Sequence, residues 1–136
     1  MSFEFDKKEL YRLAKTALES AYAPYSNFYV GAAIIAENEV GEKKTFTGCN
    51  IENASFGATI CAERTAAVKA VSEGYRKFRA IAVCSGKGKV EICGICRQFL
   101  SEFCTEDVPV ITGDDENSIE KRCFGDIFPS AFILEK

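Results

Sequence analysis

The segments CAERTAAVKA at residues 61–70 and CGICRQFL at residues 93–100 decide how this chain is interpreted. Each begins with a cysteine and continues into a helix-forming sequence, so Cys61 and Cys93 are predicted at two helix N-termini. Unpaired backbone N–H groups and the helix dipole stabilise a thiolate at that position. Cys96 follows Cys93 by three residues and lies on the same side of its helix. These two thiols can therefore bind one metal ion together.

A third thiolate, from Cys61, would complete a Cys₃ zinc site with one coordination position left for water. That arrangement is typical of catalytic zinc, whereas structural zinc has four protein ligands. Glu63 follows this ligand by two residues on the same helix, so it points in a different direction. We expect Glu63 to reach the bound water as a proton carrier and not to join the coordination shell.

The sulfur-rich site is expected to need positive charge. Three thiolates on Zn²⁺ leave a net charge of about −1, which weakens the power of the metal to acidify water. Arg64 and Arg97 are candidates to hydrogen-bond the sulfurs and to offset this charge. Either arginine could equally be a solvated charge on a helix surface.

Two other interpretations of the cysteines stay open at this point. A C-x-x-C pair at a helix start also fits a thioredoxin-like redox protein. Alternatively, Cys49, Cys84 or Cys104 could add a fourth thiolate to a structural zinc site. A carboxylate two residues after Cys61 has no use in a closed site, which favours the catalytic one. Together with Cys123, the three further cysteines are expected to be small buried or half-buried hydrophobes.

The composition is that of one small domain over residues 1–136. Hydrophobic residues make up 47% of the chain, enough for a single core. The net charge of −3, with Lys and Arg scattered, disfavours a nucleic-acid partner. The start MSFEFDKKEL carries acids, unlike a signal peptide, and no apolar run approaches the roughly 20 residues of a membrane span. Because seven cysteines favour metal binding in a reducing compartment, we expect a cytoplasmic protein with no membrane partner.

The hydrophobic pattern predicts a hairpin followed by helices that alternate with strands. Asp6 with Glu9 has the form of a capping box, so the first helix begins there and runs to about Ala21. The other expected elements are strands at 29–36, 44–48, 79–85 and 108–112, and helices at 61–73 and 94–103. The last helix is expected to turn inward Ile95, Phe99, Leu100 and Phe103. This order implies an α/β fold with one mixed sheet and helices packed on its faces.

The two cysteine segments resemble the signature of the cytidine deaminases, specifically the short all-cysteine type. The likeness extends to APYSNF at 23–28, VGAA at 30–33, TGCNIENAS at 47–55 and FPSAF at 128–132, so it covers nearly the whole chain. The resemblance implies a three-layer α-β-α cytidine deaminase-like fold with a mixed five-stranded sheet and helices on both faces. It also implies a homotetramer whose active sites are shared across interfaces.

The activity implied by the resemblance is zinc-dependent hydrolytic deamination of cytidine and 2′-deoxycytidine to uridine and 2′-deoxyuridine. One Zn²⁺ per chain and a role in pyrimidine salvage are implied with it. Glu63 would deprotonate the zinc-bound water that attacks C4, pass the proton to N3 and assist the loss of ammonia. A close alternative is a blasticidin-S deaminase, but Phe28 and the NIEN segment at 50–53 favour plain pyrimidine nucleosides.

The resemblance also assigns the substrate contacts. Asn50 and Glu52 match a pair that holds the ribose, with the carboxylate accepting from the 3′-hydroxyl. Phe28 matches an aromatic contact to the pyrimidine, and the backbone around Ala62 matches the group that reads the base edge. Phe132 matches a phenylalanine that stacks on the base from a neighbouring subunit. Without the resemblance, these would be ordinary turn residues and core aromatics.

The chain departs from the family pattern at two positions beside the ligands. Ile92 precedes Cys93 where proline is usual, and Ile95 stands where alanine is usual. Proline would pre-set the loop that enters the helix, so Ile92 is expected to loosen this entry without changing the chemistry.

Overall fold

The computed structural model describes residues 3–136 and contains a five-stranded sheet in the order β2-β1-β3-β4-β5. The strands are β1 (Val30–Glu37), β2 (Lys43–Cys49), β3 (Lys77–Ser85), β4 (Pro109–Gly113) and β5 (Ile119–Cys123). The helices are α1 (Lys7–Ala17), α2 (Ala62–Ser72), α3 (Gly94–Leu100) and α4 (Phe124–Ile127), with short 3₁₀ turns η1 (Leu18–Ser20) and η2 (Phe56–Ala58). The single domain predicted over residues 1–136 includes residues 1–2, which lie outside the described part. The assignment of one domain remains a prediction.

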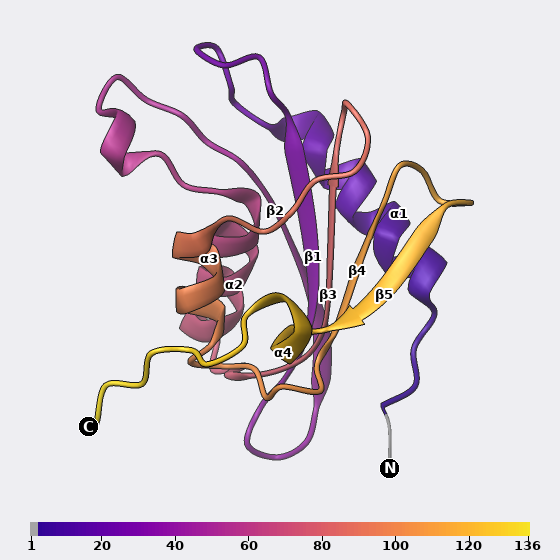
Figure 1. Ribbon diagram of the computed structural model, residues 1–136, viewed down its shortest axis with the longest axis vertical. Helices are drawn as coiled ribbons and strands as arrows, with labels where there is room; N and C mark the ends of the chain where they lie inside the picture. The colour runs from indigo at the N-terminus through magenta and orange to yellow at the C-terminus, as the bar shows by residue number, and fades with distance from the viewer. Residues whose placement is uncertain (1–2) are drawn as a thin grey trace.

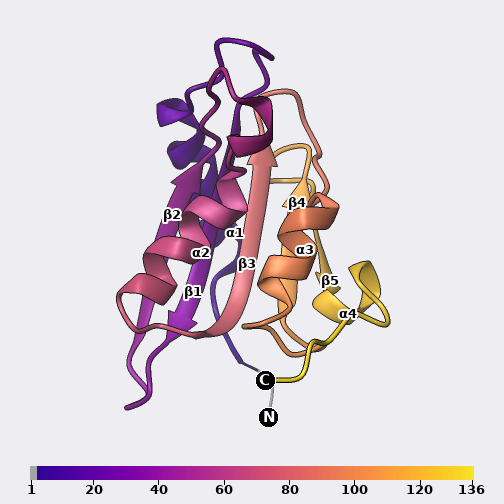
Figure 2. The same cartoon turned by 90° about the vertical axis from the view of Figure 1, so that its left-hand side faces the viewer.

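The sheet is mixed, and helices cover both of its faces. β1 pairs antiparallel with β2 and with β3, β3 pairs parallel with β4, and β4 pairs antiparallel with β5. Figure 1 shows α1 on one side of the sheet and α2 with α3 on the other, and Figure 2 views the α2 and α3 side face on. The expected three-layer α/β fold with a mixed five-stranded sheet is therefore confirmed.

The first helix begins as predicted and ends sooner. Asp6 is the N-cap, because its side chain accepts a hydrogen bond of 3.1 Å from the backbone N–H of Glu9. The α-helix ends at Ala17, and a 3₁₀ turn continues to Ser20. At Ala21 the backbone is already extended, so the chain leaves the helix just before the predicted boundary.

The inward orientation predicted for Ile95 is wrong, since this side chain is 67% exposed. The buried residues of α3 are Cys96 and Leu100, one turn apart, and they define the face that packs on the sheet. Ile95 lies about 100° around the helix from Cys96, which turns it toward solvent. The helix also ends at Leu100, short of the predicted boundary at residue 103.

The last two elements, β5 and α4, were absent from the predicted set. β5 is an edge strand whose central residues, EKR at 120–122, are charged. Charged side chains are usual on edge strands because they discourage pairing with other chains, and here they hide the strand pattern.

Each face of the sheet carries its own hydrophobic cluster, and on each face a helix lies directly on a glycine. Under α1, a Cβ added to Gly31 would lie 1.9 Å from the backbone oxygen of Ala14. Under α2, a Cβ added to Gly48 would lie 2.4 Å from the backbone nitrogen of Ala66. Only glycine permits such approaches, and the alanine face predicted for α2 is buried as expected.

The N-termini of α2 and α3 open at the same end of the sheet, where the parallel strands β3 and β4 have their carboxyl ends (Figure 2). Ligand sites in α/β folds are commonly found at this edge. Within residues 3–136, no helix combines the length and the apolar character needed to cross a membrane.

Candidate active site

The structure brings together the three cysteines that the sequence singled out. Cys61 is the N-cap of α2, Cys93 is the N-cap of α3, and Cys96 lies in the first turn of α3. Their sulfur atoms all lie within 4.8 Å of one another, and the Sγ atoms of Cys61 and Cys93 are 3.6 Å apart. A tetrahedral zinc with Zn–S bonds of about 2.3 Å holds its sulfurs about 3.8 Å apart. The cluster therefore fits zinc.

No fourth Cys, Asp or Glu side chain in residues 3–136 belongs to this cluster. Cys84 is buried, and Cys49, Cys104 and Cys123 are half-buried, in agreement with their expected role as small hydrophobes. A donor set of three sulfurs leaves the fourth position of a tetrahedral ion open to a small molecule, as in catalytic zinc sites. This arrangement does not fit a closed Cys₄ site.

Hydrogen bonds inside the cluster shift the pKa values of two of its thiols in opposite directions. The bond between the Cys61 and Cys96 thiols, with help from Arg64 and Cys93, lowers the pKa of Cys61 to about 5. The same bond, together with burial, raises the pKa of Cys96. Nη2 of Arg64 lies 3.6 Å from Sγ of Cys61 and 3.3 Å from the backbone oxygen of Thr59. One sulfur of the cluster is thus already favoured as a thiolate, the form that binds metal.

Glu63 lies in the first turn of α2 and is only 3% exposed. Burial, with a smaller contribution from the charge of Cys61, raises the pKa of its carboxyl to about 7. This side chain does not belong to the group of sulfur ligands. A carboxyl that titrates near neutral pH beside a metal-binding cluster is suited to accept and return a proton.

Arg97 does not take the position that the sequence suggested. Its Nε donates to the backbone oxygen of Ile92 at 2.7 Å, and its Nη1 donates to the backbone oxygen of Ile127 at 2.7 Å. The expectation that Arg97 bonds a sulfur is therefore not met, because these two carbonyls use its guanidinium. Arg64 alone of the two arginines contacts a cluster sulfur.

Asn50 holds two chain segments together at the edge of the sheet. Its Oδ1 accepts from the backbone N–H of Val30 at 2.9 Å, and its Nδ2 donates to the backbone oxygen of Phe28 at 2.7 Å. Asn50 is 8% exposed, whereas the ring of Phe28 is at the surface with 36% exposure. Asn50 therefore fixes the segment that presents this aromatic ring.

Glu52 is bound to the turn that precedes Phe28. Its carboxylate accepts from the backbone N–H groups of Tyr25 and Ser26 at 3.0 and 3.1 Å, and from the hydroxyl of Ser26. These bonds lower the pKa of Glu52, with the Ser26 hydroxyl as the largest cause. Ser26 was not among the site residues that the sequence indicated. The available signal was Asn27, a residue that tolerates the left-handed backbone found here, with φ of 57°.

The remaining expected contacts lie at the start of α2 and near the C-terminus. Ala62 is fully buried, so its backbone is what it can offer to a ligand. Phe132 follows α4 on the C-terminal segment and is 67% exposed. Nε2 of Gln98 on α3 donates to the backbone oxygen of Phe132 at 2.9 Å, a contact that the sequence did not indicate.

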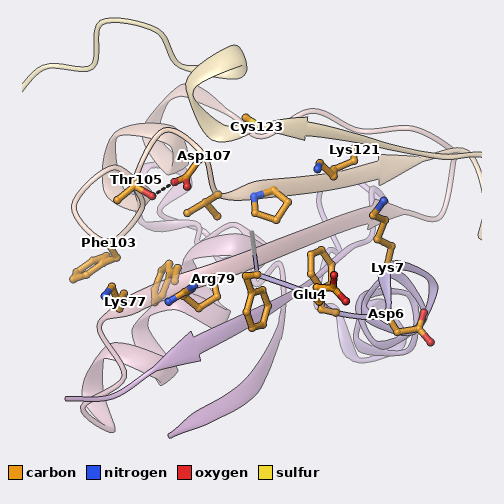
Figure 3. Close-up of a pocket in the computed structure, with 15 residues that line it drawn as sticks. Glu4, Asp6, Lys7, Lys77, Arg79, Phe103, Thr105, Asp107, Lys121 and Cys123 are labelled. Carbon is orange, nitrogen blue, oxygen red and sulfur yellow. Dashed lines mark hydrogen bonds between the residues drawn. The ribbon is translucent and has the colours of Figure 1, made fainter. Parts of the chain in front are cut away.

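A cavity of about 1110 Å³ lies at the other end of the parallel strands, between the N-terminal segment and the starts of β3 and β4 (Figure 3). Two of the charged side chains that line it, Arg79 and Asp107, have partners within the chain. Arg79 pairs with Glu37 at 3.2 Å, and Asp107 accepts a hydrogen bond from Thr105. The cavity contains none of the three clustered thiols, so the candidate active site is the cysteine cluster.

Comparison with known proteins agrees with this geometry. Residues 5–112 match the family model described as the cytidine and deoxycytidylate deaminase zinc-binding region. A cytidine deaminase of Sporosarcina psychrophila is 44% identical over 131 residues, which cover 96% of this chain and 93% of that protein. A cytidine deaminase of Halalkalibacterium halodurans is also 44% identical over 131 residues, covering 96% of each chain.

Solved structures show the same likeness. The crystal structure of cytidine deaminase from Burkholderia pseudomallei matches with a TM-score of 0.83 and 43% identity, covering 94% of this chain and 100% of that one. The structure from Mycobacterium tuberculosis matches with a TM-score of 0.77 and 33% identity, covering 96% and 100%. The sulfur cluster, the buried glutamate and these matches together show that the chain belongs to the cytidine deaminase family.

Proposed function

We propose that this chain hydrolyses cytidine and 2′-deoxycytidine to uridine and 2′-deoxyuridine, with release of ammonia, using one zinc ion held by Cys61, Cys93 and Cys96. The observation that carries the proposal is a cluster of three thiols within 4.8 Å, beside a glutamate that is only 3% exposed. Relatives at 44% identity over most of the chain are cytidine deaminases, which supports the choice of substrate.

Glu63 is the proposed proton carrier. Cys61, Cys93 and Cys96 would hold the zinc ion as thiolates, and the bound metal would supply Lewis acidity that makes a water molecule easier to deprotonate. Glu63 takes a proton from the attacking water and delivers it to N3 of the base. It then takes the remaining proton of the new C4 hydroxyl and delivers it to the amino group, which leaves as ammonia as the C4 carbonyl forms. Its pKa of about 7 supports this role, because a group that titrates near the working pH can both accept and donate.

Arg64 is proposed to stabilise the sulfur cluster electrostatically. Its guanidinium contacts Sγ of Cys61 at 3.6 Å and is anchored by the backbone oxygen of Thr59. A cation in this place offsets part of the negative charge of three thiolates, which keeps the metal effective as an acid.

Asn50, Glu52, Phe28 and Ala62 are proposed to hold the nucleoside. The Asn50 side chain donates one amide hydrogen to the backbone oxygen of Phe28 and accepts one hydrogen bond from the backbone N–H of Val30. Its second amide hydrogen and the second lone pair of its Oδ1 remain for a sugar hydroxyl. The Glu52 carboxylate is held by the Tyr25–Ser26 turn and has acceptor capacity for the 3′-hydroxyl. Phe28 would contact the pyrimidine, and the Ala62 backbone would read the base edge.

We also propose a cytoplasmic homotetramer that acts in pyrimidine salvage, with Phe132 stacking on the base in a neighbouring subunit. Phe132, Ile133 and Leu134 are 67%, 81% and 71% exposed, a run of apolar residues that supports burial against another chain. The net charge of −3 supports a small-molecule substrate over nucleic acid.

The decisive experiment is to incubate purified protein with cytidine and follow the fall in ultraviolet absorbance, with and without a strong zinc chelator. We expect turnover of cytidine and 2′-deoxycytidine, abolished by prolonged chelation and restored by zinc. Blasticidin S serves as the competing substrate. Turnover of blasticidin S with none of either nucleoside would overturn the assignment.

A further inference from the structure

Cys93 is the most exposed of the three clustered cysteines. Cys96 is buried and Cys61 is half-buried. The chain before Cys93 forms no helix or strand at residues 89–93, so regular secondary structure does not hold this cysteine from its N-terminal side. Its place in the cluster depends on contacts that fix the end of this loop.

The Arg97 side chain supplies such a contact at the Ile92–Cys93 peptide bond. Its Nε donates to the backbone oxygen of Ile92 at 2.7 Å. The backbone N–H of Arg97 also donates to the backbone oxygen of Cys93 at 2.9 Å, but this bond belongs to the first turn of α3 and does not depend on the side chain. Its Nη1 donates at 2.7 Å to the backbone oxygen of Ile127, the last residue of α4. The Ile92 side chain is only 2% exposed, which anchors the same peptide in the core.

We propose that Arg97 is a positioning residue for Cys93, which clamps the Ile92–Cys93 peptide to the end of α4 and so holds the Cys93 sulfur in the cluster. Guanidinium suits this task because its planar fork donates in two directions at once, whereas a lysine ammonium is a single point. The inference rests on the zinc-site part of the proposed function and is independent of the substrate.

This role differs from that of Arg64. Arg64 reaches the Cys61 sulfur itself, so its effect on the cluster includes its charge. Arg97 acts through backbone carbonyls, so the geometry of its fork is what matters. Replacement by lysine separates these two modes, because it keeps the positive charge and removes the fork.

The experiment compares the zinc-loaded parent protein with Arg97→Ala, Arg97→Lys and Arg79→Ala. The last variant is a matched control, since Arg79 is also partly buried and its guanidinium pairs with Glu37 away from the cluster. Zinc transfer to a chromogenic chelator is timed for each protein. We expect both Arg97 variants to release zinc about 10- to 100-fold faster than the parent, and Arg79→Ala to release it at the parent rate.

Cobalt substitution adds a readout that general destabilisation does not change. If Cys93 leaves the metal in the Arg97 variants, we expect their thiolate-to-cobalt absorption to be weaker than that of the parent. We expect Arg79→Ala to keep the spectrum of three thiolate ligands. If Arg97→Lys released zinc at the parent rate, the positive charge of Arg97 and not its hydrogen-bonding geometry would matter, and the proposed positioning role would be wrong. If Arg97→Ala released zinc at the parent rate, Arg97 would have no role in holding the metal. A folded parent without zinc would refute the metal site and the clamp together. A parent that binds zinc but does not deaminate nucleosides would refute the substrate alone, and the release rates would still decide the role of Arg97.

Discussion

Cys84 on the α1 face of the sheet is buried and Cys61 on the face covered by α2 and α3 is half-buried, and the pKa values of the two thiols shift in opposite directions. On the α1 face, Cys84 packs among Leu10 and Tyr11, and burial raises its pKa to about 11. On the other face, hydrogen bonds from Cys96 and Arg64 lower the pKa of Cys61 to about 5. The same residue type is a small hydrophobe in one layer and a metal ligand in the other because its neighbours differ.

On both faces a helix packs closely against the sheet over a glycine. On each, the sheet lacks a side chain at one position, Gly31 or Gly48, and a helix backbone approaches closely there. The helix on Gly31 carries none of the candidate site residues, whereas the helix on Gly48 has Cys61 as its N-cap and carries Glu63 in its first turn. Matched substitutions on the two faces therefore separate stability from catalysis.

The largest expected effect comes from Glu63→Gln. This change removes the proton carrier and preserves side-chain size, so we expect turnover of cytidine to fall by about 10²- to 10⁴-fold while zinc content stays at the parent level. Cys84→Ala is the control on the α1 face and should retain turnover. Steady-state assays and metal analysis measure both quantities. Parent-like turnover by zinc-loaded Glu63→Gln would contradict the assignment.

The next contrast is thiol reactivity in the metal-free protein. Hydrogen bonds from Cys96 and Arg64 lower the pKa of Cys61 and favour its thiolate, whereas burial raises the pKa of Cys84 to about 11 and keeps that thiol protonated at neutral pH. Brief treatment with iodoacetamide should therefore modify Cys61 in the native protein and Cys84 only after denaturation. Mass mapping of peptides identifies the modified residues. Equal labelling of both thiols in the folded protein would show that the two layers do not differ in this way.

Substitution of the two glycines sharpens the comparison further. Gly31→Ala and Gly48→Ala each force a methyl group against helix backbone, so we expect either change to destabilise the protein by about 1–3 kcal/mol or more. Gly48→Ala should also lower kcat, because it displaces the first turn of α2. Urea unfolding and assays on the folded fraction distinguish the two effects. An equal loss of kcat in both variants would argue against a special role for Gly48.

The smallest effect is expected from Tyr11→Phe on the α1 face. The Tyr11 hydroxyl donates to the backbone oxygen of Gly113 at 3.1 Å, and its loss should cost about 1 kcal/mol of unfolding free energy. Burial raises the pKa of Tyr11 to about 12 from 10.0, so the folded state favours the protonated form. The parent should keep this contribution below about pH 10 and lose it as the pH rises through about 12. Urea unfolding of the parent and of Tyr11→Phe between about pH 9 and pH 12 measures this dependence. If the variant lost the same unfolding free energy as the parent over this range, ionisation of Tyr11 would not be the cause.

Most of the architecture was predictable because its signals are local. The Asp6 cap, the alanine face of α2 and the apolar runs of β1 and β3 each depend on a few adjacent residues. The strand β5 was not predictable in this way, because its charged side chains suit an edge position that exists only once β4 is in place. Ile95 was misplaced since the inward face of α3 is set by Cys96 and Leu100, which meet the sheet.

By itself, the sequence determined which residues have the right chemistry: three cysteines in two helix-start segments and a glutamate two residues after the first of them. Thiolate and carboxylate chemistry, and the spacing within each segment, are properties of the local chain. Only the tertiary structure decided that Cys61 meets Cys93, 32 positions further along the chain, that Arg64 reaches a sulfur and that Arg97 does not. These outcomes depend on how closely two helices pack on one sheet, which no single segment encodes.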